Sequence, residues 1–181
     1  MKFKIFRFKK VKSTNSTAIR IIKSSNIDHG MIISRTQSNG KGQYGKKWIS
    51  YNGNLFVSFF YKIGYPKKSL KQLTKINCLL VKDLISKYYK KKIVFKKPND
   101  LLINQKKICG ILQETLTKFD NKYLIVGIGI NLKRNPNIKN YPTENLFNLI
   151  NKNLQKRMIE NNLKKIFEAK LTKLYKLKKI N

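Results

Sequence analysis

Cysteine is scarce in this sequence. Cys78 and Cys109 are the only two among 181 residues, and neither belongs to a C-x-x-C pair. A disulfide framework or a cysteine-based metal site is typically signalled by more cysteines at closer spacing. We therefore expect both thiols to pack in the core of a protein that works in a reducing compartment.

Long apolar runs are also missing. Residues 1–10, MKFKIFRFKK, are interrupted by charge at every second or third position, which excludes the apolar core of a signal peptide. No stretch approaches the ~20 apolar residues that cross a bilayer. The sequence therefore predicts a cytoplasmic protein without a membrane partner.

Acidic residues are few, 8 against 41 lysines and arginines, and the formal net charge is +33. Such an excess is typical of proteins that bind nucleic acid or an anionic surface. Most of it is lysine, spread from end to end, whereas arginine has the planar fork that best reads bases and phosphates. We interpret the charge as a solvated surface and do not expect specific DNA binding. A non-catalytic basic nucleic-acid-binding protein stays as an alternative.

Apolar residues are plentiful enough for a packed core, at 41% of the chain with 11% aromatics. At this length we expect one domain over residues 1–181. Periodicity, caps and turns predict an edge strand over 2–8, a helix after Ser13, strands over 31–37 and 54–61, a helix over 70–89, strands over 93–95 and 101–103, a hairpin strand over 107–116 after a turn at Asn104 and Gln105, a strand over 123–132, and two helices from about Glu144 to the end. This order predicts an α+β fold, a mixed sheet with helices packed on one face.

Residues 39–48, NGKGQYGKKW, hold three glycines at G-x-G-x-x-G spacing among lysines. A dinucleotide site would need a helix after the loop and an acidic residue ~20 positions on, and neither follows. A kinase loop would need H-R-D and D-F-G motifs, and the Walker pattern fails because Lys47 replaces its Ser or Thr. The loop alone indicates backbone amides and lysines that can surround an anion.

Seven short motifs occur in register along the chain. They are Ser13-Thr14-Asn15, Arg35-Thr36-Gln37, the loop Gly40–Trp48, Gly53-Asn54-Leu55, Lys96-Lys97-Pro98-Asn99-Asp100, Lys107-Ile108-Cys109-Gly110-Ile111-Leu112 and Gly127-Ile128-Gly129-Ile130-Asn131. Together they resemble the catalytic domain of biotin protein ligases, that is, biotin–[acetyl-CoA-carboxylase] ligases. The resemblance runs from about Ser13 to Asn131.

The resemblance implies an ATP-dependent ligase that activates biotin to biotinyl-5′-AMP and passes it to a lysine of a biotin carboxyl carrier protein. It implies Lys96 as the catalytic lysine between the biotin carboxylate and the α-phosphate, so that replacing Lys96 by alanine would abolish adenylation. Mg²⁺ is expected through the ATP phosphates, with no protein metal site. The implied biotin-binding residues are Ser13, Thr14, Asn15, Gln37, Lys41, Gly42, Gln43, Lys96, Gly110 and Gly127; the implied nucleotide-binding residues are Gly40, Gly42, Gly45, Lys41, Trp48 and Asn131.

Several positions depart from the family pattern. Gln43 stands where an arginine is usual, and a glutamine cannot supply charge-assisted bonds to an adenylate. Lys97 stands where tryptophan is usual, and strand alternation would turn it away from Lys96. The family's N-terminal helix-turn-helix and C-terminal SH3-like domains are not expected here. A lipoate or octanoate transferase is the alternative within the superfamily, although its R-R-x-S-G-G-G-like loop is missing.

Overall fold

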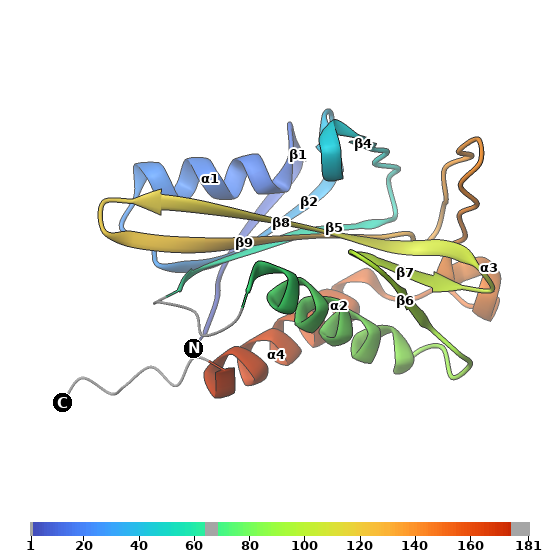
Figure 1. Ribbon diagram of the computed structural model, residues 1–181. Helices are drawn as coiled ribbons and strands as arrows, with labels where there is room; N and C mark the ends of the chain where they lie inside the picture. The colour runs from blue at the N-terminus through green and yellow to red at the C-terminus, as the bar shows by residue number, and fades with distance from the viewer. Residues whose placement is uncertain (1, 64–68, 175–181) are drawn as a thin grey trace.

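The structure is a computed structural model that describes residues 2–63 and 69–174 (Figure 1). The described elements, in chain order, are β1 (Lys4–Val11), α1 (Thr14–Ser24), β2 (His29–Gln37), β3 (Gly40–Lys41), the 3₁₀ turn η1 (Gln43–Gly45), β4 (Lys47–Trp48), β5 (Leu55–Ile63), α2 (Leu70–Ser86), β6 (Val94–Lys96), β7 (Asp100–Ile103), β8 (Lys106–Lys118), β9 (Asn121–Ile130), α3 (Leu146–Ile150) and α4 (Lys156–Leu174). This is the predicted order, with β3, η1 and β4 added inside the glycine loop. The predicted continuation of the last helix into residues 175–181 lies outside the described part.

Seven strands form one sheet in the order β1-β2-β5-β9-β8-β7-β6. β1 pairs with β2 in parallel, across the connection made by α1, and the other neighbours are antiparallel. The sheet is therefore mixed, as predicted, and β1 lies at its edge. The β3–β4 hairpin forms a separate two-stranded piece.

The helices cover both faces of the sheet. Alternate residues of β5 point to opposite sides, so that Phe59 packs in the core with α2 and α4, whereas Phe60 packs with Ala18 and Ile22 of α1. Figure 1 shows α1 on one side of the sheet and α2 with α4 on the other. The prediction of helices on one face is therefore wrong for α1. A strand that is apolar on both faces needs cover on both sides, and β5 is such a strand.

Local signals in the sequence explain where the elements begin and turn. Ser13 caps α1, its Oγ accepting from the backbone N of Ser16 at 3.5 Å. Asn104 and Gln105 both have positive φ, 49° and 62°, as the tight hairpin between β7 and β8 requires. None of the helices in residues 2–63 and 69–174 has the length and apolarity to cross a membrane.

Both cysteines are free and buried, as predicted. Burial raises the pKa of the Cys78 thiol to about 12, and the nearby Asp100 carboxylate adds to the shift. Burial likewise raises the pKa of Cys109. Thiols held protonated in this way behave as packing groups rather than nucleophiles.

Candidate functional site

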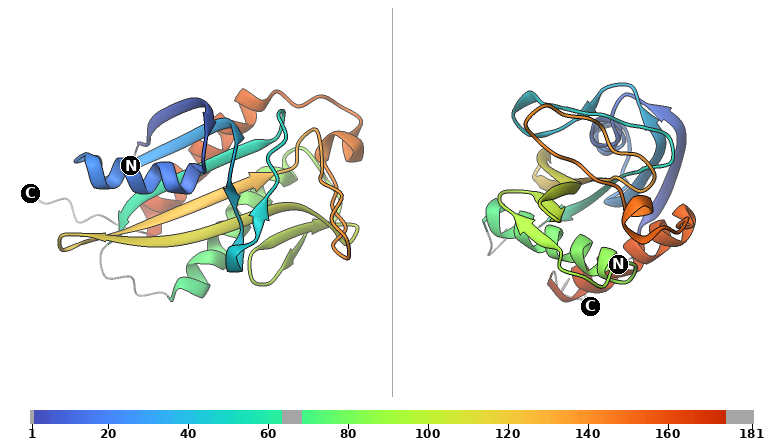
Figure 2. Two further views of the ribbon diagram at one scale, coloured as in Figure 1. Left: turned by 90° about the horizontal axis from the view of Figure 1, so that it is seen from above. Right: turned by 90° about the vertical axis from the view of Figure 1, so that its right-hand side faces the viewer.

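A cavity of about 730 Å³ opens on the side of the sheet that carries α1. Seen from above, α1, the glycine loop and the segment from about 133 to 145 follow one another along the sheet (Figure 2, left). Twelve residues that the sequence predicted line this cavity: Ser13, Thr14, Asn15, Gln37, Lys41, Gly42, Gln43, Trp48, Lys96, Gly110, Gly127 and Asn131. The other two, Gly40 and Gly45, line a second cavity of about 540 Å³ between the loop and β8.

A row of residues faces one another across five strands, and all of them except Phe56 line the larger cavity. Pairing places Phe56 opposite Gly129, Gly129 opposite Gly110, Gly110 opposite Asp100, and Asp100 opposite Lys96. Paired residues point to the same face of a sheet. The row is therefore empty of side chains in its middle and carries a carboxylate and an ammonium at its β6 end.

Trp48 of β4 occupies the empty middle of this row. A Cβ atom added to Gly129 would lie 2.4 Å from Trp48 Cε2, and one added to Gly110 would lie 2.7 Å from Trp48 Cζ3. The glycines thus admit the indole ring against the sheet. Trp48 Nε1 is buried and has no hydrogen-bond partner among the described residues, so it is a donor available to a ligand.

The start of α1 presents polar groups to the cavity. Both the backbone N and Oγ1 of Thr14 donate to Gln37 Oε1, at 2.8 and 3.1 Å. Gln37 Nε2 in turn donates to Ser50 Oγ at 3.0 Å, which fixes the orientation of its amide. Thr14 and Gln37 therefore form one ordered polar pair beside Ser13 at the end of β2, as a neutral ligand with donors and acceptors would require.

The glycine loop is a small hairpin standing over the cavity. Gly42 N donates to Lys46 O at 2.7 Å, and Gly40 and Lys41 pair with β4. In the turn between β3 and β4, Tyr44 adopts a left-handed conformation, with φ of 52°, and its side chain is 89% exposed. The loop has cavities on two sides and packs on the sheet through Trp48.

Both lysines of the K-K-P-N-D motif line the cavity. Lys96 is exposed, and its Nζ lies 4.8 Å from the centre of the Tyr141 ring. The expectation that Lys97 turns away from Lys96 is not met. β6 ends at Lys96, so the alternation of a strand no longer governs the next residue.

Lys107, which the sequence analysis did not assign to the site, is the more enclosed lysine. Its side chain is 19% exposed and its Nζ lies 2.9 Å from Asp100 Oδ1. The same Nζ lies 5.2 Å from the centre of the Trp48 ring and 5.4 Å from that of Tyr141. Tyr141 donates from its hydroxyl to Asp100 Oδ2 at 2.5 Å. Burial and this bond raise the pKa of Tyr141, so it remains a donor.

A β-bulge in β8 brings Lys107 to the cavity. Leu102 pairs with Lys107, but Leu101 pairs with Cys109, so Ile108 is an extra residue, and both it and Cys109 face the core. Simple alternation would put Lys107 and Gly110 on opposite faces of the sheet. The bulge puts them on the same face, because its extra residue changes the direction in which the following side chains point.

Comparison with known proteins shows the family of this chain. A family model described as "Biotin/lipoate A/B protein ligase family" matches residues 7–131, and the chain belongs to this family. It is 31% identical over 134 residues to the bifunctional ligase/repressor BirA of Bacillus subtilis, covering 73% of this chain and 41% of that protein. It is 27% identical over 127 residues to a biotin–[acetyl-CoA-carboxylase] ligase of Paracoccus denitrificans, covering 68% and 52%. The chain thus spans about half or less of these relatives.

Solved structures share the fold. A biotin protein ligase from Aquifex aeolicus in complex with biotin and ATP superposes with a TM-score of 0.77 at 26% identity, covering 96% of this chain and 72% of that one. A Leishmania major biotin protein ligase with biotinyl-5-AMP gives a TM-score of 0.81 at 22% identity, covering 94% and 75%. The fold is therefore that of a biotin protein ligase catalytic domain.

Proposed function

We propose that this domain is an ATP-dependent biotin–protein ligase. It joins biotin to ATP as biotinyl-5′-AMP, releasing pyrophosphate, and transfers biotin to a lysine of the biotin carboxyl carrier protein of acetyl-CoA carboxylase. The observation that carries the proposal is the single cavity in which the polar start of α1, the glycine loop, Trp48, Lys96 and Lys107 converge.

In this proposal the biotin head group binds at the start of α1. Ser13, Thr14 and Gln37 offer hydroxyl and amide groups to the neutral ureido ring, which has both donors and an acceptor. The valeryl chain then runs past the Trp48 indole, which covers the glycine row, toward β6. Its carboxylate arrives near Lys107, since this ammonium lies over Gly110 at the charged end of the row.

Adenylation brings a carboxylate against a triphosphate, and the two repel each other. Lys107 lowers this repulsion and stabilises the charge that develops at the α-phosphate during in-line attack. Lys96, which the sequence predicts as the central catalytic lysine, adds in this proposal a second positive charge at the rim of the cavity. Trp48 and Asn131, whose buried Oδ1 has no hydrogen-bond partner among the described residues, form the nucleotide side.

Mg²⁺ enters in this proposal bound to the ATP phosphates, whose charge it neutralises. The described residues contain no cluster of three or more His, Cys, Asp or Glu side chains that would hold the ion by themselves. Asp100, the carboxylate of the cavity floor, is already engaged by Lys107 and Tyr141. Mg²⁺ would then supply its charge through the nucleotide phosphates.

Transfer to the carrier is the second step of the proposal. The neutral amine of the carrier lysine attacks the acyl carbon of the mixed anhydride, the bond from that carbon to the phosphate oxygen breaks, AMP leaves, and the amine nitrogen releases one proton to solvent. The glycine loop shields the anhydride from water until the carrier arrives.

The test is ATP-dependent transfer of labelled biotin to an apo carrier domain, run beside labelled lipoate. We expect biotinylation of the carrier lysine that is lost without ATP and absent for a carrier whose target lysine is replaced. Transfer of lipoate in place of biotin would favour the lipoate or octanoate alternative. If neither biotin nor lipoate is transferred, the proposed function is contradicted.

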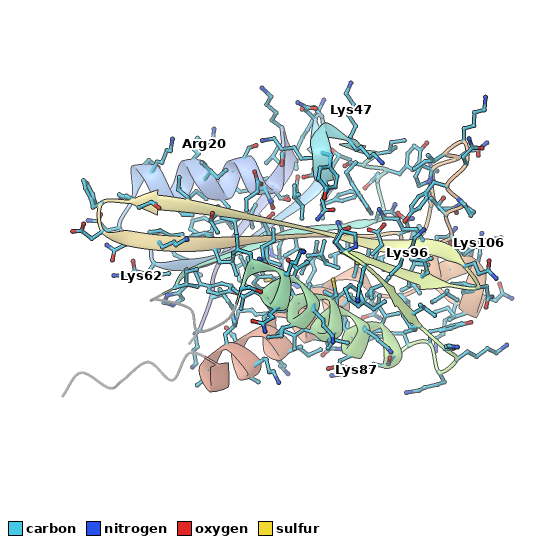
Figure 3. The ribbon with its side chains drawn as sticks, in the orientation of Figure 1. Arg20, Lys47, Lys62, Lys87, Lys96 and Lys106 are labelled. Carbon is cyan, nitrogen blue, oxygen red and sulfur yellow. The ribbon has the colours of Figure 1, made fainter. Side chains whose placement is uncertain are left out.

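Binding of nucleic acid without catalysis is the alternative from another class. Figure 3 shows Arg20, Lys47, Lys62, Lys87, Lys96 and Lys106 placed around the molecule rather than along one stripe. A dispersed charge of this kind supports a solvated surface. Steep salt-dependent binding to generic DNA or RNA would favour the alternative.

Replacing Gln43 by arginine should slow the release of biotinyl-AMP. Gln43 is half-buried in the loop and lines both cavities, so an arginine there has room to reach the adenylate with charge-assisted bonds. We expect release to slow by roughly 10-fold, about the value of one such bond. The measurement is the rate at which labelled adenylate appears in the filtrate. Equal release rates from the two proteins would remove the idea.

A further inference from the structure

Asn15 forms a buried polar link between three elements of the fold. It belongs to the first turn of α1 and is 2% exposed. Its Nδ2 donates to Glu114 Oε2 on β8 at 2.6 Å and to the carbonyl O of Leu112 at 3.3 Å. Its Oδ1 accepts from Ser58 Oγ on β5 at 2.5 Å.

These bonds leave Asn15 little to offer a ligand. A side-chain amide has two N–H donors, and here both point to protein acceptors. One lone pair of Oδ1 stays unused. The sequence predicted Asn15 as a direct biotin contact, but its geometry is that of a group that holds other groups in place.

The amide also packs directly on the sheet. A Cβ atom added to Gly127 on β9 would lie 2.3 Å from Asn15 Oδ1, so the amide fills the space above that glycine. Immediately before it in the chain, Thr14 makes two bonds to Gln37. The start of α1 is thus fastened to β2 through Thr14 and to β5 and β8 through Asn15.

We propose that Ser58 and Glu114 are positioning residues of the ligand site. They fix the Asn15 amide, and through it the first turn of α1, so that Thr14 and Gln37 face the head group of biotin. Ser58 is fully buried and Glu114 is half-buried, and neither lines the larger cavity. This inference rests on the proposed function, because it concerns biotin as the ligand.

A reciprocal exchange tests the link between Asn15 and Glu114. In N15D two carboxylates face each other where an amide donated at 2.6 Å, and we expect biotin to bind about 100-fold more weakly. In the N15D/E114Q double variant the amide at position 114 donates to the carboxylate at position 15. Biotin binding should then return to within about 10-fold of the wild type, since only the bond to Leu112 is lost.

The readouts separate positioning from loss of structure. Biotin binding is measured by calorimetry on the whole chain, and KM is measured separately for biotin and for ATP. We expect the N15D change to appear in biotin affinity and in the biotin KM, with the ATP KM within about twofold. The matched control is D83N, which removes one exposed carboxylate from α2 and should change neither quantity.

Three outcomes contradict the inference. The double variant could melt like the wild type yet bind biotin as weakly as N15D, which would assign the N–H groups of Asn15 to the ligand. The KM values for biotin and ATP could rise together as the melting temperature falls, which would make the link purely structural. S58A, which removes one hydroxyl, could bind biotin like the wild type, whereas we expect a loss of about 10-fold. A wild-type protein that binds no biotin would instead contradict the proposed function.

Discussion

Replacing Lys107 by methionine should lower the rate of biotinyl-AMP formation by about 10²- to 10³-fold. This is the usual loss when one preorganised group that stabilises transition-state charge is removed from an enclosed site. Lys107 is the enclosed cation of the cavity, 2.9 Å from Asp100 and next to Trp48. The measurement is pyrophosphate release at saturating biotin and ATP, with no carrier present.

Lys96 provides the comparison. Its side chain is exposed, and water and salt screen its charge, so we expect K96M to lose about 10-fold in the same assay. A larger loss in K96M than in K107M would return the central role to Lys96, as the sequence analysis assigned it.

K107M also leaves the Asp100 carboxylate without its cation, which by itself destabilises the fold. The K107M/D100N double variant separates the two effects. We expect its melting temperature to recover toward the wild type while adenylation stays lost. Recovery of adenylation in the double variant would mean that Lys107 serves only to neutralise Asp100.

Gly129→Ala should displace Trp48 from the sheet. The new methyl group would lie 2.4 to 2.8 Å from three atoms of the indole, too close for any real contact, and the ring has no flexible end that could give way. We expect a loss of about 1–3 kcal/mol in the free energy of unfolding. Adenylation should fall about 100-fold, because the loop that carries Trp48 is misplaced.

Trp48 is the only tryptophan of the chain, so its fluorescence reports this displacement directly. Emission should shift to the red in Gly129→Ala as the indole becomes exposed to water. The matched control is Gly30→Ala, where the added atom would lie 2.5 Å from Phe60 on the side of α1. It should destabilise the protein to a similar degree and leave the emission unchanged. Unshifted emission in Gly129→Ala would show that the ring does not depend on this glycine.

Much of the fold is encoded in local signals that can be recognised without a structure. The cap at Ser13 predicts where α1 begins, and the Asn104-Gln105 pair predicts the hairpin between β7 and β8. What such signals leave open is which helix covers which face. β5 is apolar on both faces, so its pattern requires cover on two sides but does not assign α1 to one of them.

The site could be predicted wherever a motif is continuous in the chain. Ser13 to Asn15, Gln37 and the glycine loop all reach the same cavity. Lys107 was missed for a physical reason, since its direction depends on an extra residue in β8 that alternation does not reveal. Ser58 and Glu114 were missed because each lies in a strand that reads as ordinary, and their role arises only when α1 packs on the sheet.

The pairing of β5 with β9 has a consequence for how ligand and fold depend on each other. Within the seven-stranded sheet, this pairing alone joins the strands of the first half of the chain, β1, β2 and β5, to those of the second half, β6 to β9. The start of α1 and the glycine loop belong to the first half of the chain. The glycine row and Lys107 belong mainly to the second half. Neither half of the chain holds a complete binding surface. A ligand in the cavity therefore contacts residues from both sides of the β5–β9 pairing. Because it binds only the folded chain, it stabilises the native state by mass action.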